Sequence, residues 1–440
     1  MTDAIRIVVL AFFALRLLVE GGLLLLNLRR AEATGPRVPE PLAGRIAPET
    51  AARSLAYTRE RGRLALLGMA WDAAVALALL YSGVLPWLDG RLASSGWPGG
   101  WAFVLFLAGL SAVTWLASLP LSLYGTFVVE TRFGFNHVTV GAWMLDCLKG
   151  IGLAIGLGVP VLWGAWLFMT ATGALWWLWL WLFLAGIQVV LLWLYPAVLA
   201  PIFNRFSPLP AGTLRERLES LCLATGFRSR GLFVMDASRR SSHSNAYFAG
   251  LLRPRIVLFD TLLSTMTEDE TAAVLAHEIG HFQLRHVAKR LAWGLASSLA
   301  GLWLLSLLVR WPAFFHAFGF AGPSWEAAVA IVSLAGGAFT FVATPLSTLV
   351  SRRQEFAADR YAAVHSGAPD ALGSALVKLS GENLANLHPH PWYGAWYHGH
   401  PTLLDRLRAL RTGAGAGRDA ATRSAASHTA AAAETGSRER

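Results

Sequence analysis

The sequence predicts a mainly α-helical protein that crosses a membrane several times and carries a smaller α+β domain. Of the 440 residues, 55% are hydrophobic and only 15% are charged, whereas soluble globular domains carry about 25% charged residues. The chain also holds 19 tryptophans, and this apolar material exceeds what one soluble core would bury. The composition therefore excludes an ordinary soluble enzyme, a largely disordered chain and a collagen-like structure.

Apolar stretches long enough to cross a bilayer, roughly 20 residues each, occur seven times. The first is a span rather than a signal peptide, because it contains Arg16 and Glu20 and shows no small-residue cleavage site. Positions 150–204 contain no charged side chain, and we expect a helical hairpin that turns at Thr172-Gly173. The seven expected spans are residues 7–28, 64–88, 101–129, 150–171, 175–199, 291–309 and 327–350.

The net charge of +10 suits anionic lipid headgroups, because no separate basic domain is present. We therefore expect a lipid bilayer and no nucleic acid as partner. The connection 29–63 carries eight arginines, which marks it as cytoplasmic. Seven spans then place the N-terminus outside and both 200–290 and the C-terminal part in the cytoplasm. The arginine, alanine and glycine bias indicates a bacterial genome, and hence the bacterial inner membrane.

The residues His277-Glu278-Ile279-Gly280-His281 form an HExxH pattern. Thr267 and Glu270 form a capping-box signature for the start of a helix over this region. On a helix, positions i and i+4 share one face, so His277 and His281 can bind one zinc ion while Glu278 faces a metal-bound water. The two cysteines cannot build a cysteine-rich zinc module.

A catalytic zinc of this kind takes three protein ligands and leaves one position open. Glu355, expected to begin a helix just beyond the seventh span, is the favoured third ligand, and Glu382 is an alternative. Asp359 lies four residues after Glu355 and would accept the free N–H of a ligand histidine. Alternatively, Glu355 and Asp359 belong to a solvated face paired with the arginines at 352, 353 and 360.

One zinc ion per chain, held by these ligands, would supply the Lewis acidity for peptide hydrolysis, with Glu278 as the general base. Residues 241–248 and 255–260 read as a β-hairpin beside the zinc helix. Its edge could pair with an extended peptide, which makes Asn245 and His243 candidate substrate-binding residues. The alternative is a purely structural hairpin. Near the end of the chain, His400 is the candidate for oxyanion contact, and Arg406 could orient it.

Several blocks of sequence, taken in order, resemble the Ste24-like CAAX prenyl protease 1 family of M48 integral-membrane zinc peptidases. The resemblance covers about residues 55–411. The matching blocks are residues 130–136, 194–196 with 201–204, 241–250, 255–263, 277–281, 355–359 and 400–407.

The resemblance implies seven helices that enclose a chamber, capped by a cytoplasmic zincin-type α+β domain with a small β-hairpin or sheet. It implies His277, His281 and Glu355 as zinc ligands, Glu278 as the catalytic base and Asp359 as support for a ligand. Asn245 and His400 would meet the substrate, with Arg406 close by. Eukaryotic relatives remove the C-terminal tripeptide of farnesylated CaaX proteins. For this chain we expect a membrane-associated polypeptide, prenylated or misfolded, as substrate.

The expected domains are a five-helix membrane domain (1–204), a peptidase domain that includes spans six and seven (205–411), and a disordered tail (412–440) that has almost no large apolar residue. The alternative function is a membrane transporter or scaffold with a structural zinc. The charges Arg16, Glu20 and Asp72 within spans would support it, since such charges often mark transport pathways. Arg16 and Glu20 could instead pair with each other at i,i+4 spacing.

Overall fold

Among the described residues, seven helices of the computed structural model are long and apolar enough to cross a membrane, which confirms the number predicted. The structure describes residues 1–250, 254–368 and 370–412. The predicted tail lies outside the described residues from position 413 onward. The candidate spans are Thr2–Thr34, Pro48–Tyr81, Gly99–Glu130, Val140–Ala171, Gly173–Phe203, His286–Leu308 and Trp325–His365.

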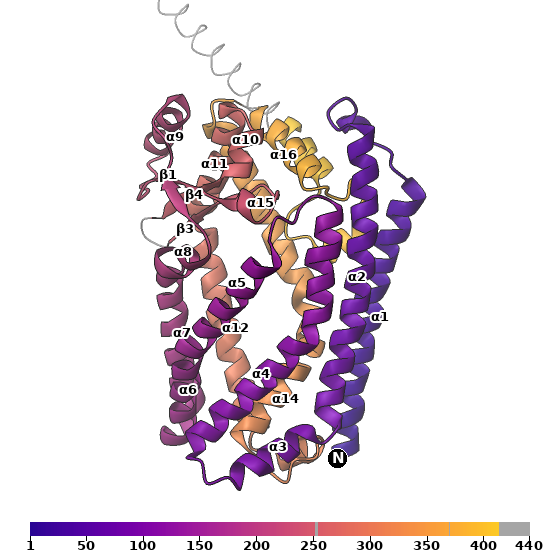
Figure 1. The fold of residues 1–440 in the computed structure, drawn as a ribbon, viewed down its shortest axis with the longest axis vertical. Helices are drawn as coiled ribbons and strands as arrows, with labels where there is room; N and C mark the ends of the chain where they lie inside the picture. Colours follow the sequence, from indigo (N-terminus) through magenta and orange to yellow (C-terminus); the bar gives the residue numbers. More distant parts are fainter. Residues whose placement is uncertain (251–253, 369, 413–440) are drawn as a thin grey trace, which may run out of the picture.

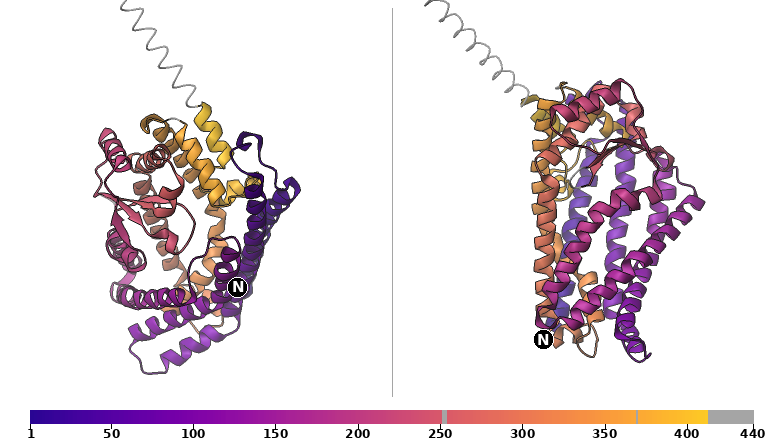
Figure 2. Two further views of the ribbon diagram at one scale, coloured as in Figure 1. Left: turned by 45° about the horizontal axis from the view of Figure 1, so that its top comes forward. Right: turned by 90° about the vertical axis from the view of Figure 1, so that its left-hand side faces the viewer.

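The long helices run roughly along the long axis of the molecule and are arranged around its centre (Figures 1 and 2). Contacts connect them in the order α2, α1, α14, α4, α6, α7 and α12. In the span Gly173–Phe203 none of the most apolar window is buried, as expected for side chains that face lipid. These helices are α1 (Thr2–Thr34), α2 (Pro48–Tyr81), α4 (Gly99–Tyr124), α5 (Val140–Leu153), α6 (Val159–Ala171), α7 (Trp176–Leu194), α12 (His286–Leu308) and α14 (Trp325–Thr340).

Short helical elements complete or connect the spans. Three are π-helical turns that continue a span: η2 (Gly125–Glu130), η3 (Ala154–Gly158) and η5 (Tyr195–Leu199). The others are η1 (Glu40–Leu42), α3 (Val84–Ala93), η4 (Gly173–Leu175), α8 (Ala200–Phe203), α13 (Pro312–His316) and η7 (Phe341–Ala343).

Two predicted spans have wrong boundaries. The helix that contains most of 64–88 ends at Tyr81, because Gly83 adopts a left-handed backbone (φ 79°) and α3 starts anew. The fourth span begins at Val140 rather than near 150. Its first turns carry the charged residues Asp146 and Lys149, so they did not belong to an uninterrupted apolar stretch and were left out of the predicted span.

The seventh span leads directly into the helix that carries Glu355. The sequence predicted a helix that starts at that glutamate, but α15 runs over Thr344–His365 and follows α14 through the single turn η7. One near-continuous helical rod therefore connects the membrane to the Glu355 side chain.

A four-stranded sheet lies at one end of the bundle, opposite the N-terminus (Figure 1). The strand order is β1-β2-β4-β3, in which only the β2–β4 pair is parallel. Strands β3 and β4 form the predicted antiparallel hairpin, and β3 is an edge strand. The strands are β1 (Phe206–Pro208), β2 (Leu232–Met235), β3 (Ala246–Ala249) and β4 (Arg255–Phe259).

Helices pack on this sheet around a second hydrophobic core. Leu218, Leu258, Leu275 and Ile279 are almost fully buried in it. An ion pair between Arg240 and Asp146 joins the segment before β3 to the membrane helix α5. The helical elements of this part are α9 (Thr213–Ala224), η6 (Ala237–Arg239), α10 (Asp260–Thr265), α11 (Glu268–Gln283), α15, α16 (Ala371–Glu382) and α17 (Pro391–Tyr397), and residues 403–412 are also helical.

The two helices α11 and α15 pack closely against each other at Gly280. A β-carbon there would stand 3.2 Å from the Cα of Ala358 and 3.1 Å from the Cβ of Tyr361, atoms that cannot move without the backbone. We expect Gly280→Val to lower the free energy of unfolding by about 1–3 kcal/mol, measured as a lower midpoint of thermal unfolding in detergent. Gly301→Val is the control, since nothing lies within 4 Å of that position. An equal effect of both substitutions would contradict the close helix contact.

Candidate metal centre

Helix α11 presents the HExxH residues from a well-capped start. The Oγ1 of Thr267 accepts the N–H of Glu270 (3.2 Å), and the carboxylate of Glu270 accepts the N–H of Thr267 (2.8 Å). The predicted capping box and helix are therefore present. As i and i+4 neighbours, His277 and His281 project from the same face.

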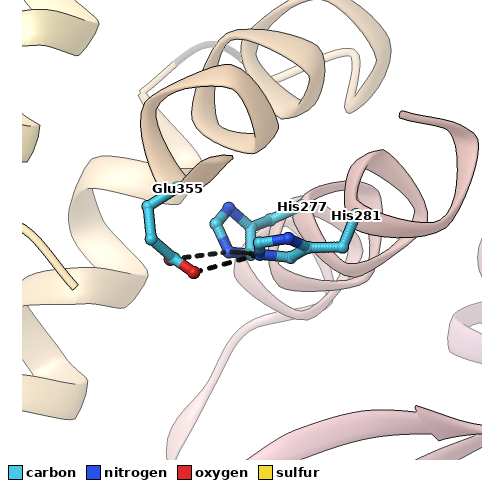
Figure 3. Close-up of side chains that lie close together, drawn as sticks. All are labelled: His277, His281 and Glu355. Atoms are coloured by element: carbon cyan, nitrogen blue, oxygen red, sulfur yellow. Dashed lines mark hydrogen bonds and ion pairs between the residues drawn. The ribbon is translucent and has the colours of Figure 1, made fainter. Parts of the chain in front are cut away.

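Figure 3 shows these two imidazoles and the Glu355 carboxylate meeting between α11 and α15. The Nε2 atoms of the two histidines lie 3.2 Å apart. The Glu355 oxygens lie 3.4 Å from His277 Nε2 and 3.3 Å from His281 Nε2. One potential ligand atom from each residue falls within 4.8 Å of the others, so a single metal ion could contact all three.

The donor set fits a metal better than it fits a purely hydrogen-bonded cluster. Glu355 is 2% exposed, and its Oε2 lies 2.7 Å from His400 Nδ1 and 3.4 Å from His277 Nε2, but neither contact among the described residues has the geometry of a well-formed hydrogen bond. A buried carboxylate oxygen with such poor partners is costly unless a cation compensates it. Two imidazole nitrogens with one carboxylate are zinc ligands. The alternative ligand Glu382 is exposed at the end of α16 and is not part of this group.

Asp359 stands directly behind His277. Its Oδ1 lies 2.9 Å from His277 Nδ1, so it can accept the ring N–H and leave Nε2 free for a metal. Burial acts to lower the pKa of His277, but the hydrogen bonds with Asp359 and Glu355 outweigh it and raise that pKa to about 9. The carboxylates of Asp359 and Glu355 together therefore stabilise a positive charge on the His277 ring.

Arg406 takes a different place from the one expected. Its guanidinium is buried and donates to both Asp359 oxygens, at 2.9 and 2.5 Å. The structure brings Arg406 to Asp359 and to within 3.5 Å of His277 Nδ1, with no hydrogen bond to His400 among the described residues. The arginine therefore supports the residue that orients His277.

We expect Arg406→Leu to weaken zinc binding by about 10- to 100-fold, because Asp359 would keep a buried charge without its partner. A competition titration against a chromogenic chelator measures the change. Arg408→Leu is the control, since that side chain is 73% exposed and, among the described residues, pairs only with Asp405. Wild-type zinc affinity in a folded Arg406→Leu protein would show that the arginine does not act on the metal centre.

Glu278 is half-buried and points toward the sheet. It lies against Ala246, Tyr247 and Phe248 of β3. Burial raises the pKa of its carboxyl, against the opposing effect of positive charge on His277 and His281. A raised pKa suits a general base that must also deliver a proton.

His400 is the most open side chain at the centre, with 72% of it exposed. Its Nδ1 lies 2.7 Å from Glu355 Oε2. The structure therefore brings His400 to the group of metal-ligand candidates, on a side that remains accessible.

One residue of the centre was missed. His286 is 4% exposed, and its Nδ1 lies 2.9 Å from Nδ1 of His281. Its Nδ1 can accept the Nδ1–H of His281 and leave His281 Nε2 free for a metal, as Asp359 does for His277. His286 follows Arg285, whose left-handed backbone (φ 57°) interrupts the helix between α11 and α12. The sequence spacing of the histidines does not predict this interruption.

The two substrate-binding candidates before β3 have different surroundings. Asn245 is exposed, and its side chain accepts only the N–H of Ala246 among the described residues. His243 instead bonds to Glu130 and Asn383, so its ring is held by protein groups away from the three metal-ligand candidates.

The charges within the spans are partly paired. Arg16 Nε donates to Glu20 at 2.8 Å, which matches the structural alternative. Asp72 is exposed and shares with them the wall of a cavity of about 300 Å³.

The fold and this site together define a membrane-embedded metallopeptidase. Two family models match the chain: CAAX prenyl protease N-terminal, five membrane helices, over residues 27–205, and Peptidase family M48 over 208–414. The chain belongs to the CAAX prenyl protease 1 family of M48 metallopeptidases and is thus a peptide hydrolase of the membrane.

Individual relatives agree over nearly the whole chain. A CAAX prenyl protease 1 homolog of Oryza sativa subsp. japonica is 37% identical and aligns over 85% of this chain and 90% of its own length. CAAX prenyl protease 1 of Saccharomyces cerevisiae is 34% identical over 85% of this chain and 88% of its own. The crystal structure of S. mikatae Ste24p superposes with a TM-score of 0.86 at 31% identity, covering 92% of this chain and 99% of that one.

Proposed function

We propose that this chain is a zinc metalloendopeptidase in which His277, His281 and Glu355 hold one zinc ion. The observation that carries the proposal is the buried meeting of two imidazoles with a carboxylate whose Oε2 has no well-formed hydrogen bond among the described residues. A carboxylate buried in this way is stabilised when a cation binds it. The metallopeptidase family also implies a metal.

Each residue around the ligands would have a separate role in hydrolysis. When bound, zinc would supply Lewis acidity for a water and for a peptide carbonyl. Glu278 would take the proton of the attacking water and pass it to the departing amine. Asp359, held by Arg406, orients His277. His400 is open to substrate and would hydrogen-bond the oxyanion of the tetrahedral intermediate.

We propose an extended segment of a membrane-associated polypeptide, either of CaaX type or misfolded, as substrate. Strand β3 supports this, because it is an edge strand and lies directly against Glu278. Edge strands bind extended peptides through backbone pairing, and Asn245 would hold a substrate backbone group. The relatives are named as prenyl proteases.

We further propose that the metal centre faces the cytoplasm of a bacterial cell. The arginine-rich connection between α1 and α2 lies at the same end of the molecule as the sheet (Figure 1), and basic connections stay on the cytoplasmic side. Residues 1–204 would form the membrane domain and 205–411 the peptidase domain.

The test uses the purified full-length chain in detergent or proteoliposomes. We expect chelator-sensitive cleavage of a fluorogenic peptide, restored by zinc, together with accumulation of trapped polypeptides on Glu278→Gln in membranes. X-ray absorption at the zinc edge should show three protein ligands and an open position. Four protein ligands and no cleavage would instead indicate the scaffold or transporter with a structural zinc.

A further inference from the structure

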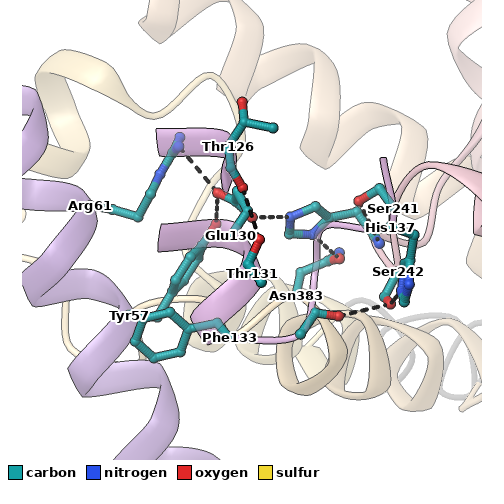
Figure 4. Close-up of polar contacts among 12 residues, drawn as sticks. Tyr57, Arg61, Thr126, Glu130, Thr131, Phe133, His137, Ser241, Ser242 and Asn383 are labelled. Carbon is teal, nitrogen blue, oxygen red and sulfur yellow. Dashed lines mark hydrogen bonds and ion pairs between the residues drawn. The ribbon is translucent and has the colours of Figure 1, made fainter. Parts of the chain in front are cut away.

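The segment Glu130 to Asn136, one of the blocks of family resemblance, has no place in the metal centre. Glu130 ends the π-helical turn η2 at the top of the third span. Its Oε1 accepts the Tyr57 hydroxyl at 2.8 Å and Arg61 Nη1 at 3.2 Å, both from α2 (Figure 4). Helix α2 therefore fixes this carboxylate of the neighbouring span.

The other oxygen of Glu130 faces the peptidase domain. Its Oε2 lies 3.4 Å from His243 Nε2, and the opposite ring nitrogen, Nδ1, lies 2.9 Å from Asn383 Oδ1. The ring also stacks on Phe135, with centroids 4.0 Å apart and planes at 18°. His243 thus joins the membrane helices, the block 130–136 and the connection after α16.

Asn383 binds the backbone and a side chain of the segment that precedes the edge strand β3. Its Oδ1 accepts the backbone N–H of Ser244 at 3.3 Å as well as the His243 ring. Because a backbone N–H can only donate, this bond identifies Oδ1 as the acceptor and requires a proton on His243 Nδ1. The Thr261 hydroxyl donates to the His243 carbonyl at 3.1 Å.

The position of Asn383 is itself enforced by its neighbour. Leu384 adopts a left-handed backbone (φ 47°), which is unfavourable for a residue with a β-carbon. Its side chain is 3% exposed and packs with Val129, Phe133 and Phe135. Burial in this small core offsets the strained backbone, so the block 130–136 holds Asn383 in place.

Glu130 and Asn383 thus form a clamp on His243 and Ser244, which lie three and two residues before β3, the strand that borders Glu278. The residues Glu130, His243 and Asn383 also line a cavity of about 740 Å³ that reaches His398, two residues before His400. The carbonyl of Asn245 accepts the N–H of Phe259, which begins the hairpin register. The placement of residues 243–245 therefore sets where the open edge of β3 stands relative to the catalytic carboxylate.

We propose that Asn383 is a positioning residue for substrate binding: through His243 and Ser244, and backed by Glu130, it fixes the β3 edge against which an extended peptide pairs. The proposal rests on the proposed function of that edge. Loss of the clamp should weaken binding of the peptide more than it slows the chemical step, because the metal ligands and Glu278 belong to other elements.

The test compares Asn383→Leu, which removes the acceptor at similar size, with Asn383→Asp, which keeps it. Asn386→Leu is the matched control from the same connection, since Asn386 bonds to Asn27 and to the N–H of His388. We measure KM and kcat on an extended fluorogenic peptide, zinc per chain, and the Kd of the same labelled peptide in a Glu278→Gln background. We expect Asn383→Leu to raise KM and Kd about tenfold, with kcat and zinc nearly unchanged, and the other two variants to stay within about twofold.

An unchanged KM in folded Asn383→Leu would overturn the proposal, and so would an equal rise in Asn383→Asp. If Asn383→Leu does not fold, Asn383→Ala decides, because it removes the same acceptor with a smaller side chain: we expect KM to rise at least about threefold, and a wild-type KM overturns the proposal. If the wild type cleaves no peptide, the proposed function fails, whereas the Kd comparison still judges the role of Asn383.

Discussion

Glu278→Gln is expected to remove peptide hydrolysis while leaving zinc in place. Glutamine preserves the shape of the side chain but cannot take a proton from water, and position 278 is not among the three ligand candidates. The loss of kcat should be about 10²- to 10⁴-fold, the usual contribution of a general base. The measurement is kcat on a fluorogenic peptide with zinc per chain determined on the same sample.

The control for this substitution is Glu268→Gln. Glu268 lies on the same helix α11 but is exposed at its first turn, where it accepts the Thr213 hydroxyl. Hydrolysis close to wild type in Glu278→Gln, at full zinc occupancy, would assign the base to another residue. Loss of zinc together with activity would make Glu278 a ligand rather than the base.

Glu355→Ala should release the metal and abolish hydrolysis with it. The substitution removes the only carboxylate of the described ligand group and leaves two imidazoles, which cannot complete the three-ligand set of a catalytic zinc. We expect zinc affinity to fall by more than about 100-fold, beyond the effect of losing a supporting residue. Competition with a chelator of known affinity measures it.

Glu382→Ala is the matched control, because Glu382 was the alternative ligand and is exposed. Its zinc affinity should equal that of the wild type. The assignment of the third ligand would be contradicted if Glu382→Ala lost zinc, or if Glu355→Ala kept it.

Local patterns in the sequence predicted the parts of the fold and site that depend on local geometry. The HExxH helix and its capping box require only the i,i+4 and i,i+3 relations of a helix, and the β3–β4 hairpin requires only alternation and a short connection. Seven apolar stretches gave the right number of spans. Their ends were less certain because α2 and α3 are both apolar, so only the left-handed Gly83 separates them.

Contacts between distant segments could not be predicted in the same way. Arg406 meets Asp359 across 47 positions, and Asn383 meets His243 across 140. Nothing in either local sequence specifies such a partner, because the pairing depends on how α15, α16 and the membrane helices pack. His286 was missed for a different reason. The left-handed backbone of Arg285 brings the His286 side chain to His281, whereas in a regular helix residues five positions apart do not share a face.

The most direct test of a zinc-dependent peptidase is a titration of zinc into the metal-depleted, purified chain while peptide cleavage is followed. The rate should rise in proportion to bound zinc and level off at one ion per chain, because His277, His281 and Glu355 form the one ligand group found among residues 1–250, 254–368 and 370–412. Glu278→Gln should bind the same single ion without gaining activity. Cleavage that is independent of zinc, or a fully loaded wild type that cleaves nothing, would contradict the account.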